Sequence, residues 1–402
     1  MLMTLEDVRK AYAPLQGIVR RTPLLTSKTI DDMAGGPVSL KAENLQKTGS
    51  FKIRGAYTAL SRLSAADRLQ GVVTASAGNH AQGIALAAKL TETRSVVYMP
   101  VAASIAKVIA TRGYGADVRL AGDSFDGAVA AAEAFARESG ATFISAFDHD
   151  DIIAGQGSVG LELLEDLPDL ETVIVPVGGG GLISGMALAL KESKPSIRIV
   201  GVQAEGCSAA LQSWKCGDVT AVAHAATIAD GIAVKKPSGR TLQYLRKYVD
   251  EMVTVGDEEI ATTIVTLLER MKLLVEGAGA AALTALIARK ATPKGRTAVL
   301  LSGGNIDIKL LEGLIERAML QAARYLRIFT AVDDKPGGLA RLLHEIAAAR
   351  GNVMEVIHNR TSAAVPIGKT GVEILIETRG SSHVTELLDR LKGAGYPVTV
   401  MS

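Results

Sequence analysis

Short apolar runs that alternate with alanine-rich amphipathic stretches constrain the fold of this 402-residue chain more than any other feature. The apolar runs, which we read as strands, comprise residues 72–76, 95–99, 117–120, 172–177, 198–203 and 297–302. The stretches of helical periodicity between them cover residues 80–90, 104–112, 126–138 and 182–192. Strands that are apolar on both faces and alternate with helices form parallel sheets with helices on both sides. We therefore expect an α/β fold whose ligands bind at the carboxyl ends of the strands.

The C-terminal part of the chain has a different order of elements. After a helix expected over 308–325, the pattern predicts strand, helix, strand, strand, helix and strand. These elements are expected at residues 326–332, 338–350, 353–360, 371–377, 383–392 and 398–401. Two central strands without a helix between them form a hairpin, which gives the ferredoxin-like βαββαβ arrangement. We place one domain at residues 1–322, with a smaller subdomain over about 45–150, and a second domain at residues 323–402.

Charge and hydropathy exclude several classes of protein. The 44 basic and 42 acidic side chains nearly cancel, and no basic cluster with interleaved aromatic residues indicates nucleic-acid binding. The most apolar stretch, around residues 278–288, is too short to span a bilayer, and the acidic N-terminal residues do not resemble a signal peptide. Cys207 and Cys216 match neither a zinc pattern nor a disulfide framework. We expect a soluble cytoplasmic protein that binds neither membranes nor nucleic acid.

Lys52 is the first residue that points to chemistry. It lies between Phe51 and Ile53, among small and apolar residues. An amine in apolar surroundings loses its charge more easily than a solvated amine and can act as a nucleophile toward carbonyl carbons. Most lysines are solvated, however, so Lys52 taken alone is better read as a surface lysine at the start of a helix.

Three further loops lie between a strand end and the next segment. Residues Ser76, Ala77, Gly78, Asn79 and His80 could hold a carboxylate at a helix N-terminus, or could simply form an N-cap turn. Residues Gly178, Gly179, Gly180, Gly181 and Leu182 favour a phosphate over a flexible turn, although they match neither a Walker A loop nor a dinucleotide fingerprint. The third loop, Ser302 to Asn305, offers a hydroxyl group and a flexible backbone.

A carbonyl-trapping lysine with a phosphate-binding loop and no nucleotide motif indicates pyridoxal 5′-phosphate. In the same order along the chain, Ser50–Gly55, Ser76–Gly83, Gly178–Leu182 and Ser302–Asn305 resemble the cofactor-binding segments of fold-type II pyridoxal-phosphate enzymes, specifically the threonine dehydratases (threonine ammonia-lyases). The resemblance covers residues 5 to about 320. It implies the two-subdomain parallel-sheet fold of tryptophan synthase β.

The resemblance also implies roles for single residues. Lys52 would bind the cofactor and then remove the α-proton of the substrate, and Phe51 would pack against the pyridine ring. Asn79 would donate a hydrogen bond to the 3-oxygen of the ring, and residues 178–182 would supply amides to the phosphate. Ser302 would face the pyridine nitrogen, and residues 76–80 would hold the substrate. A hydroxyl does not keep that nitrogen protonated as a carboxylate would, so the ring is a weaker electron sink and less carbanion builds up. Loss of a β-leaving group then competes well with transamination.

The implied reaction converts L-threonine to 2-oxobutanoate and ammonia, and also L-serine to pyruvate. Two alternatives stay open: a serine or 3-hydroxyaspartate dehydratase or racemase of the same fold, and a non-catalytic amino-acid sensor. Ala77 stands where serine racemases have a second serine that acts as acid and base, so elimination is favoured. The racemase-type divalent-cation site would need acidic residues around Glu205, Ala209 and Leu211. Since Leu211 departs from that pattern, we expect no metal.

The C-terminal domain resembles an ACT domain. The resemblance rests on the turn from Asp334 to Gly337 and on the pair Gly351 and Asn352. ACT domains bind amino acids at interfaces between paired copies, so the resemblance implies isoleucine or valine as an effector and a homodimer or homotetramer. The alternative is a dimerisation module without a ligand.

Overall fold

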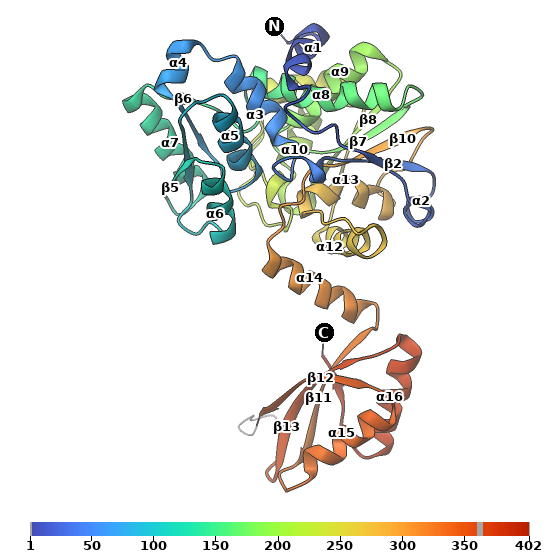
Figure 1. The fold of residues 1–402 in the computed structure, drawn as a ribbon. Coiled ribbons are helices and arrows are strands. Elements are labelled where there is room, and N and C mark those ends of the chain that lie inside the picture. The colour runs from blue at the N-terminus through green and yellow to red at the C-terminus, as the bar shows by residue number, and fades with distance from the viewer. Residues whose placement is uncertain (1, 360–364, 402) are drawn as a thin grey trace. The chain divides into compact units, whose positions relative to one another are not determined.

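The computed structural model describes residues 2–359 and 365–401, and its contacts divide the chain into two compact units (Figure 1). The units are Met1–Asp307 and Ile308–Ser402, so the division falls earlier than the boundary that we expected after residue 322. The reason is helix α14 (Ile308–Gln321), which belongs with the C-terminal unit because its Glu316 pairs with Arg327 of strand β11 (Tyr325–Asp333).

A six-stranded sheet with the order β1-β2-β10-β7-β8-β9 forms the centre of the N-terminal unit. Its strands are Leu24–Leu25, Val38–Ala42, Thr297–Leu301, Thr172–Pro176, Arg198–Ala204 and Glu251–Val255, in that order. They are parallel except for β1. Figure 1 shows α8 (Asp150–Asp166) and α9 (Gly181–Ser193) on one side of this sheet, and α12 (Asp257–Thr266) and α13 (Gly277–Ile287) on the other. The remaining helices are α1 (Leu5–Leu15), α2 (Lys28–Ala34), α10 (Ala209–Cys216) and α11 (Gly239–Tyr248).

A second, four-stranded parallel sheet has the order β5-β4-β3-β6 and lies within the range expected for the smaller subdomain. Its strands are Asp117–Leu120, Ser95–Met99, Val72–Ala75 and Thr142–Phe143. The helices around it are α3 (Lys52–Ser61), α4 (Ala65–Gln70), α5 (Asn79–Leu90), α6 (Ile105–Gly113) and α7 (Phe125–Ser139). The expected α/β fold with parallel sheets is confirmed.

Strands β1, β2 and β9 of the larger sheet and β6 of the smaller sheet were not predicted. Strand β2 contains Lys41, which is fully buried in an ion pair, and β9 begins with Glu251. The charged residue inside β2 interrupts the apolar run from which strands are recognised. The predicted strands, by contrast, begin and end within two residues of those in the structure.

The C-terminal unit has an antiparallel sheet of four strands in the order β12-β13-β11-β14. Its further elements are α15 (Gly338–Ala348), β12 (Asn352–Asn359), β13 (Lys369–Glu377), α16 (Ser381–Gly393) and β14 (Thr399–Val400). This order confirms the expected βαββαβ arrangement. The last residue of one expected strand, Arg360, lies outside the described residues.

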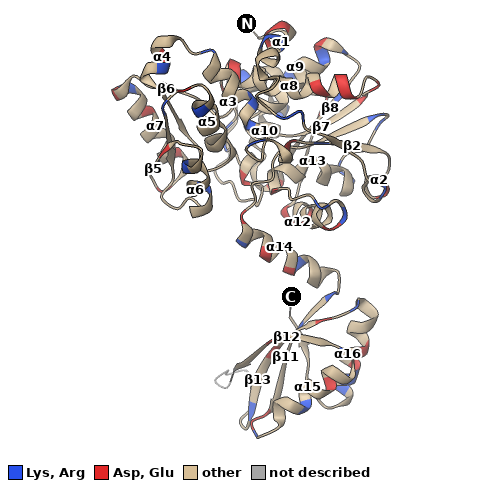
Figure 2. Ribbon diagram, viewed as in Figure 1, with Lys and Arg blue, Asp and Glu red and all other residues tan. Residues whose placement is uncertain are grey.

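Charged residues of both signs are interspersed along the surface helices, as α14 illustrates (Figure 2). None of the helices in residues 2–359 and 365–401 combines the length and the apolar character needed to cross a membrane.

Candidate active site

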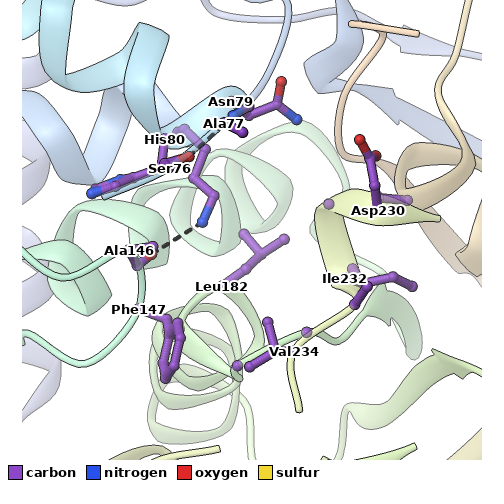
Figure 3. A pocket seen from close by; sticks show the side chains of 18 of the residues that line it. Ser76, Ala77, Asn79, His80, Ala146, Phe147, Leu182, Asp230, Ile232 and Val234 are labelled. Atoms are coloured by element: carbon purple, nitrogen blue, oxygen red, sulfur yellow. Dashed lines mark hydrogen bonds between the residues drawn. The ribbon is translucent and has the colours of Figure 1, made fainter. Parts of the chain in front are cut away.

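One cavity of about 450 Å³ brings the sequence-predicted segments together (Figure 3). It lies at the carboxyl ends of β3, β7 and β10, where parallel sheets commonly bind ligands. Its volume is in the range of pockets for small molecules. The predicted residues that line it are Phe51, Lys52, Ser76, Ala77, Gly78, Asn79, His80, Gly178, Gly179, Gly181, Leu182 and Ser302.

Lys52 is the first residue of α3, and its amine donates a hydrogen bond of 3.0 Å to the carbonyl oxygen of Ala146. The amine lies 5.2 Å from the centre of the Phe51 ring. Burial lowers the pKa of Lys52 to about 8, although the nearby carboxylate of Glu276 opposes this shift. Lys52 is therefore much easier to deprotonate than a surface lysine.

The loop from Ser76 to His80 joins β3 to α5. The Ser76 hydroxyl accepts a hydrogen bond of 3.2 Å from the Gly78 amide. The His80 ring lies in the protein interior, with Nε2 3.2 Å from the carbonyl oxygen of Ile144, and in Figure 3 it points away from Leu182. Burial lowers the pKa of His80 to about 3, so the ring is neutral and its Nε2–H donates to Ile144. The imidazole therefore does not supply a positive charge for a substrate carboxylate.

The tetraglycine loop connects β7 to α9 and is closely packed. A Cβ atom on Gly179 would lie 2.4 Å from the Phe147 ring, and one on Gly181 would lie 2.9 Å from the Phe147 Cα atom. Gly180 has a φ of +95°, a conformation that favours glycine, and faces Thr241 rather than the cavity. The loop brings backbone N–H groups to the N-terminus of a 13-residue helix, which is a site suited to an anion.

Ser302 follows the last strand of the larger sheet and is buried beside the cavity. Its hydroxyl donates a hydrogen bond of 3.3 Å to the carbonyl oxygen of Ala278. A hydroxyl hydrogen can rotate, so Ser302 could instead donate to a ligand atom that accepts a hydrogen bond.

Glu276 is a cavity residue that the sequence analysis did not identify. Its side chain is 4% exposed, and its Oε1 accepts a hydrogen bond of 2.5 Å from Asn79 Nδ2. Asn79 Oδ1 in turn accepts a hydrogen bond of 2.7 Å from Asn305 Nδ2. Burial, with a contribution from Asp230, raises the pKa of Glu276 to about 7. The one local signal was an acidic residue directly before the apolar run of α13.

Arg54 lies two positions after Lys52 and is buried in a cluster of charged side chains. Its guanidinium donates to Glu43 at 2.8 Å and to Glu162 at 2.7 Å. Lys41 adds a second cation, 2.7 Å from Glu162. These ion pairs hold the first turn of α3, which includes Lys52, in place against β2 and α8.

Two of the residues considered for a divalent cation make other contacts in the structure. Glu205 lies 3.8 Å from the amine of Lys290, and Leu211 is buried in the apolar core. Among the residues that the structure describes, no group of three or more metal-ligating side chains occurs.

The four candidate regulatory residues of the C-terminal unit lie at two ends of its sheet. Asp334 and Gly337 follow the end of β11, whereas Gly351 directly precedes β12 and Asn352 is its first residue. Asn352 and Tyr325, the first residue of β11, both pair with Glu377, so Asn352 lies level with the start of β11. One small amino acid cannot contact both pairs in one copy of the unit, because a strand of nine residues spans about 27 Å.

Comparison with known proteins agrees with this geometry. Residues 15–303 match the model of the family described as "Pyridoxal-phosphate dependent enzyme". An L-threonine ammonia-lyase of Geobacter sulfurreducens is 48% identical over 395 residues, which cover 98% of both chains. Another of Thermotoga maritima is 44% identical over 400 residues, and the match covers both chains completely. The structure of maize serine racemase superposes with a TM-score of 0.75 at 34% identity, covering 80% of this chain and 99% of the racemase. The chain therefore belongs to the family of pyridoxal-phosphate dependent enzymes.

Proposed function

We propose that this protein deaminates L-threonine to 2-oxobutanoate and ammonia, and L-serine to pyruvate, by α,β-elimination. The observation that carries the proposal is the convergence of Lys52, the tetraglycine loop and Ser302 on one cavity. The full-length similarity to L-threonine ammonia-lyases supports the choice of substrate.

The residues present fit pyridoxal 5′-phosphate. The amides of residues 178–182 would hold its phosphate at the N-terminus of α9. The glycines let this loop pack against Phe147 and Thr241 without a Cβ clash. The amine of Lys52 would hold its aldehyde carbon, and Phe51 would pack against its ring. Asn79 would donate to the 3-oxygen of the ring, and Ser302 would face the ring nitrogen.

When bound, the cofactor supplies an electron sink for negative charge at the α-carbon of the substrate. The Lys52 amine accepts the α-proton, and its pKa of about 8 leaves a substantial neutral fraction near physiological pH. The N-terminal turn of α5, with the Ser76 hydroxyl, holds the substrate carboxylate. Ser302, as a neutral hydroxyl, would not keep the ring nitrogen protonated, so the ring would be a weaker electron sink. Loss of the β-hydroxyl, which takes up a proton and leaves as water, would then compete well with transamination.

The first test is a steady-state comparison of threonine and serine. We expect threonine to have the higher kcat/KM, by about ten-fold, because its methyl group can be buried against apolar side chains such as Leu182, Ile232 and Val234. The measurement is formation of 2-oxobutanoate and of pyruvate, each identified by its mass. Absence of 2-oxobutanoate from a preparation that contains the cofactor would refute the proposed activity.

Exchange of Ala77 for serine tests the distinction between elimination and racemisation. Ala77 lines the cavity, and a serine hydroxyl there could return a proton to the α-carbon from the face opposite Lys52. In Ala77→Ser we expect D-serine formation from L-serine to increase by about ten-fold or more relative to pyruvate formation. Chiral chromatography measures the ratio, and Ala77→Gly is the control because it adds no hydroxyl. An unchanged ratio in Ala77→Ser would contradict this interpretation of the loop.

We also propose that the C-terminal unit is an ACT domain that binds isoleucine or valine and contributes to a homodimer or homotetramer. Its βαββαβ topology and the turn from Asp334 to Gly337 support this assignment. Titration of either amino acid into the full-length protein should release heat and change the KM for threonine. If neither amino acid binds, the C-terminal unit serves only to associate copies of the chain.

A further inference from the structure

We infer that Glu276 is a positioning residue for the cofactor, and that it acts by fixing the side-chain amide of Asn79. The inference deepens the proposed function, because it rests on the role proposed for Asn79 toward the cofactor. Glu276 lies at the N-terminus of α13, but its side chain makes no capping hydrogen bond to that helix. Its carboxylate instead lies beside the cavity and accepts the hydrogen bond of Asn79.

A chain of hydrogen bonds fixes the orientation of the Asn79 amide. The carbonyl oxygen of Thr48 can only accept, so the atom of Asn305 that lies 2.7 Å from it is the amino group. The same amino group lies 2.7 Å from Asn79, which must therefore turn its oxygen toward Asn305. The Asn79 amino group then faces Glu276, whose carboxylate accepts one of its two N–H bonds. The second N–H remains available to a ligand in the cavity.

Gly303 shows that the backbone is shaped around this contact. A Cβ atom at position 303 would lie 2.2 Å from Glu276 Oε1 and 3.1 Å from Asn79 Nδ2. The amide of Glu276 also donates a hydrogen bond of 3.1 Å to the carbonyl oxygen of Gly303. The loop that carries Ser302 and Asn305 therefore needs glycine at this position to admit the carboxylate.

The surroundings of Glu276 make burial of its carboxylate energetically unfavourable, so a residue that only filled space here would not be expected to carry one. Lys52 faces it from α3, Lys107 from α6 and Asp230 from the turn at residues 230–232. Burial raises its pKa to about 7, and Asp230 adds to this shift, while the Asn79 hydrogen bond and the two lysines oppose it. A buried carboxylate is unfavourable unless its partners compensate the lost hydration. An apolar residue would pack here without that cost, so the hydrogen bond to Asn79 is the feature that needs an acceptor oxygen at this position.

The experiment measures binding of pyridoxal 5′-phosphate to the full-length protein, by titration into variants that have been stripped of it. We expect Glu276→Ala to weaken binding by about ten- to a hundred-fold, since a charged hydrogen bond is lost. Glu276→Gln retains an acceptor oxygen and should stay within about three-fold of the wild type. The double variant of Glu276→Ala with Asn79→Ala should bind no more weakly than Asn79→Ala alone, because both changes remove the same contact.

The pH at which the absorbance of the bound cofactor changes is a second measurement, and loss of protein stability alone would not shift it. A hydrogen bond to the 3-oxygen favours its ionised form, so loss of the bond should raise the pH midpoint of the absorbance change. Glu276→Ala and Asn79→Ala should raise this pH midpoint equally. The control Glu251→Ala, which removes a surface ion pair with Arg198, should leave the midpoint unchanged. Additive losses of affinity in the double variant, or wild-type affinity and spectrum in Glu276→Ala, would overturn the inference. Neither readout needs turnover, so a protein that binds the cofactor without deaminating threonine refutes the proposed activity only.

Discussion

We expect exchange of Lys52 for alanine to lower the turnover of threonine by at least about a thousand-fold. The exchange removes both the amine that holds the cofactor and the base that accepts the α-proton. The glycine loop and Asn79 are unchanged, so the variant should still bind pyridoxal 5′-phosphate, but without a covalent bond. Formation of 2-oxobutanoate measures the loss. Reduction with borohydride followed by mass spectrometry shows whether the cofactor is attached.

Lys47→Ala is the matched control. It removes another lysine, which is exposed and lies outside the cavity, in the segment before α3. It should retain wild-type turnover and covalent attachment of the cofactor. Full activity in Lys52→Ala would show that a different group accepts the α-proton. A wild-type protein that binds threonine without forming product would instead favour the amino-acid sensor that the sequence left open.

The second large effect is expected for exchange of Arg54 for leucine, which should lower the free energy of unfolding by about 3–5 kcal/mol. Arg54 is fully buried, and its removal leaves the carboxylates of Glu43 and Glu162 without their shared partner. Denaturation by urea, followed by far-UV circular dichroism, measures the change. Because α3 begins at Lys52, the affinity for the cofactor should fall as well.

Arg62→Leu provides the comparison at the end of the same helix. Arg62 pairs with Asp151 at the surface, where such a pair contributes about 1 kcal/mol or less. A loss in Arg54→Leu as small as in Arg62→Leu would contradict the role given to the buried cluster.

The pH dependence of the free energy of unfolding tests the same cluster of buried charges around Arg54. Burial alone would raise the pKa of Glu43, but the Arg54 guanidinium holds it below its usual value of 4.5. The stabilisation from this carboxylate is therefore fully present above about pH 4.5 and is lost as the pH falls through the lowered folded-state pKa. The difference in unfolding free energy between the wild type and Arg54→Leu should narrow over that acidic range.

Most of the cavity could be predicted from local sequence. Ser76, the tetraglycine loop and Ser302 each follow an apolar strand, and the carboxyl ends of parallel strands are where ligands bind. Glycine and small polar residues at such turns carry a direct physical meaning. Strand β2 was missed because its buried Lys41 interrupts the apolar pattern, and the ion pair that allows this burial involves Glu162, far along the chain.

The sequence by itself determined the parallel sheets, the βαββαβ order of the C-terminal unit and the loops that converge on Lys52. Periodicity and turn residues act over a few positions, so one chain is enough to read them. Only the tertiary structure decided that Glu276 contacts Asn79, that Arg54 joins Glu43 to Glu162, and that Asn352 lies away from Asp334. These pairings join distant segments, and the local pattern around each residue does not indicate which side chain it will meet. The contact between Glu276 and Asn79 also sets the orientation of the Asn79 amide in the cavity.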